Sequence, residues 1–361
     1  MQAIGKDELL FKYRILYNGY PIVNEFSQGA FPLPFPVDKY DEEKIYFDDY
    51  YGRFFTGDFL NQKAMVYGGI LVDYDHGANV NLERVDSLRV PYRLIPVFKA
   101  SNLQEIELAV EQMKLHSPNN IFLYRGQGQI YTINRSEEEN MELYGCFMPV
   151  KEPSFLPSFQ RSKLNYHKVV SAWHNVCALL TEEMMKSHSD VFFDFRQREL
   201  FHLLALGLAQ HYGLPSVGLD LTDDLNVALW FAIYKATYSS KESVKAELVD
   251  DNSEATIFVF RCHPRSVYRY SDLVKGIGAH RPDAQRAYFN YCGWGLSKNQ
   301  LALDLACAFR VDSSFAKELS DNYIRYLFPK MEDDEVLRVL LQIKDKYQGT
   351  DLGEMMERIY L

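Results

Sequence analysis

An arginine followed directly by glycine is the first feature of this sequence whose chemistry suggests a ligand. Arg125, Gly126 and Gln127 end a short apolar run of β-forming residues. The guanidinium has five donors in a planar fork, which suits a diphosphate or a ribose phosphate. The glycine lets the backbone approach a ligand closely, and the Gln127 amide can hydrogen bond a carboxamide of that ligand. Arg125 could instead pair with a carboxylate such as that of Asp220, but we favour the ligand, because an arginine beside glycine at a strand end is a natural anion site.

Four further polar side chains follow in a segment that alternates between helix and strand signals. Asp220 and Thr222 are two apart on a predicted strand, so both face one side and would orient ribose hydroxyls in a cleft. Alternatively, Thr222 and Asp223 cap the next helix. His211 and Tyr212 end an apolar helix, where we expect them to contact a ring of the ligand or to act in acid–base chemistry. The alternative is that the histidine bonds helix-end carbonyls and the tyrosine packs in the core.

Composition and motifs exclude several other kinds of site. The sequence contains no G-x-S-x-G, Walker or H-E-x-x-H pattern, and its five cysteines form no C-x-x-C pair. We therefore expect no metal site and no disulfide scaffold. The 39 Lys and Arg residues against 49 Asp and Glu residues give a net charge of −10. This balance argues against bulk electrostatic binding of duplex nucleic acid and still allows a local basic channel.

The elements that must position these residues change in character along the chain. The first 100 residues are rich in Tyr, Phe, Gly, Pro and Asp, with short apolar runs between turn residues, which predicts strands and loops. Leu103, Ile106, Val110 and Met113 then recur at helical spacing, with Ser101 or Asn102 as the N-cap. We place the boundary near this helix and predict a β-rich N-terminal module at 1–115 and a second unit at 116–361.

The second unit alternates strands and helices. Ile121 to Tyr124 and Ala255 to Arg261 are predicted to form buried strands. A helix-rich block from Tyr166 to Tyr212 ends at Gly213 and Pro215. Further elements are predicted as a strand over 216–222, a helix that contains 227–232 and begins at Asp223 or Asp224, and an amphipathic helix over 333–347.

Several of these segments together resemble the FRG domain, a family named for an aromatic–Arg–Gly motif. The segments are Tyr124-Arg125-Gly126, "LPSFQR" from Leu156, "AQHYGLPSVGLDLTDDLNVALWFA" from Ala209, and "RPDAQRAYF" from Arg281. They occur in the family's order within residues 118 to 310. The chain departs from the family pattern at Ser216, Val217, Leu221 and Ala287.

The resemblance implies a fold and a substrate. The order of elements is similar to that of ADP-ribosyltransferases, which implies an α+β fold with a split sheet, surrounding helices and NAD as substrate. By this analogy Arg125 holds the NAD phosphates, with Gly126 and Gln127 beside it. The remaining roles fall to Asp220 and Thr222 at the ribose, His211 and Tyr212 at the nicotinamide or acceptor, and Gln285 at the third motif.

Gln285 is the residue that fits this chemistry least. Cleavage of the nicotinamide–ribose bond builds positive charge on the sugar, which a carboxylate stabilises and a neutral amide stabilises poorly. If Gln285 occupies the position of the usual glutamate, another carboxylate must act or the activity is lost. Asp220, Glu199 and Glu254 are the candidates, and their spacing does not distinguish them.

The leading hypothesis is NAD-dependent ADP-ribosyl transfer to a nucleobase of DNA or RNA, or to a protein side chain. The resemblance implies a toxin or anti-phage setting, with the N-terminal module as reader of the acceptor. The alternatives are a non-catalytic module that binds a nucleotide or nucleic acid, and an NAD glycohydrolase. We find no signal peptide and no apolar run that spans a bilayer, so we expect a cytoplasmic protein without a membrane partner. The sequence leaves the oligomeric state open.

Overall fold

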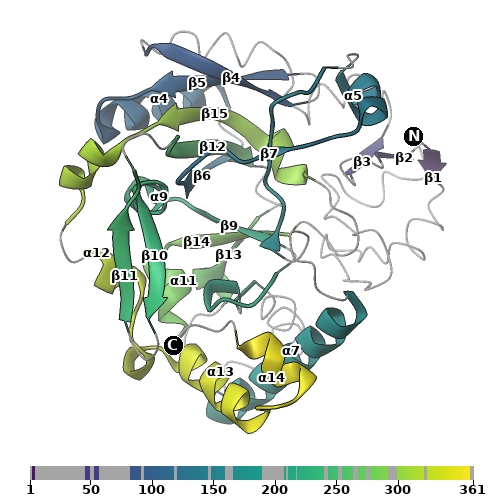
Figure 1. Ribbon diagram of the computed structural model, residues 1–361, viewed down its shortest axis with the longest axis vertical. Coiled ribbons are helices and arrows are strands. Elements are labelled where there is room, and N and C mark those ends of the chain that lie inside the picture. The colour runs from purple at the N-terminus through teal and green to yellow at the C-terminus, as the bar shows by residue number, and fades with distance from the viewer. Residues whose placement is uncertain are drawn as a thin grey trace.

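An eight-stranded mixed sheet forms the centre of the computed structural model (Figure 1). Its strand order is β13-β14-β9-β6-β12-β15-β5-β4, and every neighbouring pair is antiparallel except β15 and β5. The strands are β4 (Arg84–Val90), β5 (Arg93–Lys99), β6 (Ile121–Gln127), β9 (Gly218–Thr222), β12 (Thr256–Cys262), β13 (Tyr268–Arg269), β14 (Ala287–Tyr291) and β15 (Leu305–Arg310). The structure describes residues 2–4, 45–48, 53–56, 82–90, 93–117, 120–144, 148–158, 166–188, 207–208, 210–216, 218–239, 243–250, 254–262, 267–273, 277–291, 299–320 and 323–357.

Smaller sheets and helices surround the central sheet. The small sheets pair β1 (Gln2–Ile4), β2 (Ile45–Asp48) and β3 (Arg53–Thr56); β7 (Thr132–Ile133) and β8 (Glu152–Pro153); and β10 (Tyr234–Ser239) and β11 (Ser243–Leu248). The α-helices are α4 (Leu103–His116), α5 (Glu137–Tyr144), α7 (Tyr166–Ser187), α9 (Leu225–Ile233), α10 (Tyr270–Leu273), α11 (His280–Ala284), α12 (Tyr323–Leu327), α13 (Glu335–Lys346) and α14 (Asp351–Met356). The described residues also form the 3-10 helices η2 (Gln300–Asp304), η3 (Ser313–Glu318) and η4 (Met331–Asp333). The α+β class expected from the sequence is confirmed.

Helix caps explain where the main helices begin. The Asn102 side chain accepts a hydrogen bond from Glu105 N (3.0 Å) at the start of α4. Asp224 accepts from Asn226 N (2.9 Å) at the start of α9, so Asp224 and not Asp223 is the N-cap. Asp334 accepts from Leu337 N (3.0 Å) and begins α13. Each cap satisfies a backbone N–H that the helix itself leaves without a partner.

Among the described residues, three of the hydrophobic clusters pack against the sheet. One packs α4 and α9 on β6, β12 and β15, and a second fills the opposite face between β4, β5, β6 and β12. The third joins α7, α13 and α14 to β14, and these helices lie together at one end of the molecule in Figure 1. Strands β4 and β5 precede residue 115 and still belong to the central sheet, while the division at 115 and 116 stays a prediction.

Gly126 is the point at which α9 comes closest to the sheet. A Cβ atom at this position would lie 1.8 Å from the Ala228 carbonyl oxygen and 2.6 Å from Ala232 N, both in the backbone of α9. The sequence suggested that this glycine admits a ligand to the backbone, and the close approach that the structure shows is that of a helix. Replacing Gly126 must therefore move α9.

We expect Gly126→Ala to lower the free energy of unfolding by about 3 kcal/mol, the upper part of the range for an overpacked core. Urea unfolding followed by circular dichroism measures this loss. Gly128→Ala is the matched control, since its Cβ would meet only the Val249 side chain at 3.3 Å and the Ala232 carbonyl oxygen at 3.7 Å. Equal stabilities of the two variants would contradict the packing described.

Candidate functional site

A cavity of about 400 Å³ lies beside the end of β6. Arg125 and Gln127 are two apart on this strand, so both side chains point to one face, and both line the cavity. This volume falls within the range of small-molecule sites. The other lining residues are Gly128, Tyr131, Thr132, Ser154, Phe155, Leu156 and Leu219.

The Arg125 guanidinium also reaches the neighbouring strand. The register of β6 and β9 contains the pair Tyr124 and Thr222, and beyond it Arg125 Nη1 donates to the Asp220 carbonyl oxygen (2.6 Å). The contact that the structure gives is thus with the main chain of Asp220, whereas the sequence had suggested its carboxylate. A guanidinium has five N–H groups, so it can hold this carbonyl and a phosphate at once.

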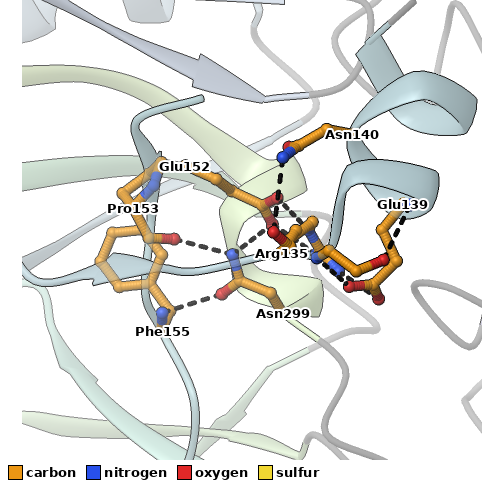
Figure 2. Close-up of polar contacts among 8 residues, drawn as sticks. Arg135, Glu139, Asn140, Glu152, Pro153, Phe155 and Asn299 are labelled. Carbon is orange, nitrogen blue, oxygen red and sulfur yellow. Dashed lines mark hydrogen bonds and ion pairs between the residues drawn. The ribbon is translucent and has the colours of Figure 1, made fainter. Parts of the chain in front are cut away.

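The far wall of the cavity depends on a buried ion pair, shown in Figure 2. Arg135 donates to both oxygens of Glu152, through Nε to Oε2 and through Nη2 to Oε1 (2.7 Å). Their side chains are 7% and 1% exposed. Asn299 Nδ2 donates to Glu152 Oε1 (2.8 Å) and to the Pro153 carbonyl (2.7 Å), while its Oδ1 accepts from Phe155 N (2.8 Å). The network therefore holds in place the segment that contains Ser154 and Phe155, two residues of the cavity wall.

This network was missed by the sequence-based reasoning. Its members come from three separate segments, and each is a common surface residue type. No periodicity or local motif indicates that they meet, so a single sequence carried no signal for them.

A second polar cluster lies across β9 from the cavity. Leu219 lines the cavity, whereas Asp220, the next residue, faces the opposite side of the strand. Its Oδ2 accepts from Gln210 Nε2 (2.7 Å), and its Oδ1 lies 3.4 Å from His211 Nε2. The other ring nitrogen, Nδ1 of His211, lies 3.1 Å from Gln285 Oε1. Asp220, His211 and Gln285, predicted separately as site residues, are thus brought together.

Burial shifts the pKa values of Asp220 and His211 in this cluster. Removal from water raises the pKa of Asp220 above that of an ordinary aspartate, although the charges of His211 and Arg125 oppose the shift. Burial also lowers the pKa of His211, against the attraction of Asp220. Both effects favour the neutral form of the residue concerned.

Thr222 and Tyr212 have structural contacts in the described chain. Thr222 Oγ1 donates to the Gln285 carbonyl (2.8 Å) and accepts from Asp224 N (3.0 Å), which matches the capping alternative. The Tyr212 side chain is fully buried, and its hydroxyl donates to Asp334 (2.8 Å). This placement matches the alternative in which the tyrosine packs in the core.

The candidate carboxylates differ in where they lie. Asp220 is bonded through its carbonyl to Arg125, and its side chain is 23% exposed. Glu254 is exposed and pairs with Arg310 (2.9 Å), and Glu199 lies outside the described residues. Asp220 is therefore the candidate that the structure places beside Arg125, while none of the described residues that line the cavity is acidic.

Within the ranges given above, no three His, Cys, Asp or Glu side chains gather as metal ligands would. None of the helices described there is both long enough and apolar enough to cross a membrane.

Comparisons with known proteins give one positive result. A search of curated proteins found no match, and a search of solved structures found none. The similarity to ADP-ribosyltransferases therefore remains an expectation. The family model of the FRG domain matches residues 120–241, which hold Arg125, His211 and Asp220. This part of the chain is an FRG domain.

Proposed function

We propose that this protein binds NAD in the cavity beside Arg125 and transfers its ADP-ribose group to a nucleic acid or protein acceptor. The observation that supports the proposal most is that Arg125 and Gln127 line one cavity of about 400 Å³. An arginine fork suits the pyrophosphate of NAD, and an amide suits its carboxamide. Tyr131, half-exposed at the same cavity, offers an aromatic face to a ring of the ligand.

The transfer needs no oxidant or reductant. The bond between the ribose C1′ and the nicotinamide nitrogen breaks, its electron pair leaves with nicotinamide, and the acceptor forms a new bond to C1′ while losing a proton. Positive charge grows on the sugar as the first bond breaks. Asp220 is the candidate carboxylate whose main chain bonds Arg125, and its side chain lies on the other side of β9 from the cavity. We assign it the stabilisation of that charge from across the strand.

A second candidate function is binding of a nucleotide without turnover. It is favoured by the described cavity wall, which contains no acidic side chain, and by Gln285. The Gln285 amide is neutral and is engaged with His211 and with the Leu327 carbonyl (3.2 Å). A neutral amide stabilises a developing cation poorly. A cavity that holds Arg125 but has no carboxylate to stabilise the sugar cation would bind a nucleotide and leave it intact.

Nicotinamide release from NAD by the purified protein separates these functions. The reaction is run alone and with single-stranded DNA, RNA or cell protein as acceptor. Release that requires an acceptor supports the transferase, and the acceptor that works decides between nucleic acid and protein. Release without any acceptor supports a glycohydrolase. Binding of NAD without release supports the binding module. A transferase would also fit the toxin or anti-phage setting that the family resemblance implies.

Asp220→Asn is expected to lower nicotinamide release about 100-fold, because the amide cannot balance the charge of the sugar. The wild-type rate should fall in acid as Asp220 takes up a proton. Since burial raises the pKa of Asp220, this fall should begin at a higher pH than for an ordinary aspartate. The rate of Asp220→Asn should not show this fall in acid. The exposed control variant Asp345→Asn should keep both the wild-type rate and its fall in acid. Retention of the fall in acid by Asp220→Asn would refute the assignment.

A further inference from the structure

Gln285 determines which ring nitrogen of His211 carries a hydrogen. Gln285 Nε2 donates to the Leu327 carbonyl oxygen (3.2 Å), so its Oε1 must face His211 Nδ1 (3.1 Å). An amide oxygen is an acceptor only, and the histidine nitrogen opposite it must therefore donate. The hydrogen-bond network thus assigns the Nδ1–H tautomer to neutral His211.

The other nitrogen of His211 is then a buried acceptor. The His211 side chain is 2% exposed, and within the described chain its Nε2 makes no hydrogen bond. The nearest charged atom is Asp220 Oδ1, at 3.4 Å. An ionised Asp220 also presents an acceptor, so two acceptors face each other. A proton placed between them would satisfy both atoms.

We propose that Asp220 and His211 together are the proton acceptor of this site. In the proposed resting state Asp220 is ionised and His211 is neutral. The pair then takes up the proton that the acceptor loses during transfer and holds it between Oδ1 and Nε2. The Asp220 side chain is 23% exposed and the His211 side chain 2%, so Asp220 is the member of the pair that solvent reaches. Gln285 is a positioning residue that keeps Nε2 free of hydrogen. The use of this proton in transfer rests on the proposed function, whereas its binding site does not.

Burial favours the neutral ring of His211, against most of the charges around it. Arg281 Nη1 donates to the His211 carbonyl (2.9 Å), and this cation disfavours a second positive charge. Asp334 acts in the opposite direction from the start of α13, as does Asp220. Burial outweighs these attractions and lowers the pKa of His211.

Burial favours proton binding by Asp220, and the groups around it oppose this effect. Arg125 from β6 and Gln210 Nε2 (2.7 Å) favour the carboxylate, and the Tyr270 hydroxyl approaches Oδ1 at 3.4 Å. Burial acts against them and raises the pKa of Asp220. The carboxylate is thereby a stronger base than an exposed aspartate.

Long-range ¹⁵N–¹H NMR of the full chain with ¹⁵N-labelled histidine tests the proposal without NAD. At pH 7.5 we expect His211 as the neutral Nδ1–H tautomer, with its resonances identified by their absence from His211→Gln. As the pH is lowered, the Nε2 signal should change together with uptake of one proton by the pair. An imidazolium or an Nε2–H tautomer at pH 7.5 in the wild-type protein would overturn the proposal, whatever the variants do.

Two substitutions at Gln285 sharpen the test. Gln285→Met removes the acceptor for Nδ1–H, so the hydrogen should move to Nε2 and bond Asp220 permanently. Transfer should then fall at least about 10-fold, as expected for loss of a proton acceptor. Gln285→Glu keeps an acceptor at Nδ1 and should preserve the tautomer, and exposed Gln348→Glu is its control. An unchanged tautomer in a folded Gln285→Met protein would contradict the role of Gln285.

The NMR result and nicotinamide release can fail separately. The expected tautomer in a protein that never releases nicotinamide would refute the proposed function and leave the proton site standing. Release of nicotinamide from a protein with the wrong tautomer would support the function and refute the proton acceptor.

Discussion

Arg125→Lys is expected to lower nicotinamide release from NAD about 100-fold, with most of the loss in affinity for NAD. Lysine keeps the charge and loses the planar fork, so it cannot hold the Asp220 carbonyl oxygen and also present two parallel donors to a phosphate. A hydrogen bond to a charged group contributes about 1.5–3 kcal/mol, so loss of one such bond lowers the affinity by about 10- to 150-fold, a range that contains the expected factor. Initial rates over a range of NAD concentrations measure the effect.

The control for this substitution must separate chemistry from folding. Arg84 is exposed on β4 at the edge of the sheet, and Arg84→Lys should leave the rate unchanged. The melting temperatures of both variants should remain close to that of the wild type, because a lysine at position 125 keeps one donor for the Asp220 carbonyl oxygen. A folded Arg125→Lys protein with the wild-type rate would show that this side chain does not hold the phosphates.

Arg135→Met is expected to cause the largest loss of stability, about 3–5 kcal/mol in the free energy of unfolding. The substitution leaves the Glu152 carboxylate buried, at 1% exposure, without its cationic partner. Arg135→Met combined with Glu152→Leu should recover part of the loss, because the buried charge is gone. Recovery should be incomplete, since Asn299 then loses an acceptor. Urea unfolding of the full chain measures these differences.

An exposed ion pair provides the matched comparison. Lys186 and Glu183 lie 2.8 Å apart on α7, with side chains 59% and 39% exposed. Lys186→Met should cost about 0.5 kcal/mol or less, since water already screens this pair. If Arg135→Met costs no more than Lys186→Met, the buried network does not stabilise the fold or the cavity wall that it supports.

Local signals explain which elements could be predicted. The helix at 103–116 and the helix at 335–346 each carry an apolar stripe and a capping side chain within a few residues, so neighbours in sequence determine them. The buried strands β6 and β12 carry runs of β-forming residues, and the sequence located both. Such elements depend little on distant contacts.

Motifs identify candidate residues and not the directions of their side chains, so the geometry of the candidate site could be predicted only in part. Arg125 and Gln127 do line one cavity, whereas Gly126 between them faces α9. The partner of Gln285 is His211, in a segment far away in the sequence, and local spacing contains no information on that contact. The Arg135–Glu152 pair was unpredictable for the same reason.

Calorimetric titration of NAD into the purified protein tests most directly whether the Arg125 cavity is an NAD site. We expect NAD and ADP-ribose to bind, nicotinamide alone to bind far more weakly, and Arg125→Lys to weaken NAD at least about 10-fold, as loss of one charged hydrogen bond implies. Arg84→Lys should bind as the wild type does. Absence of NAD binding, or equal binding by the wild type and Arg125→Lys, would contradict the account.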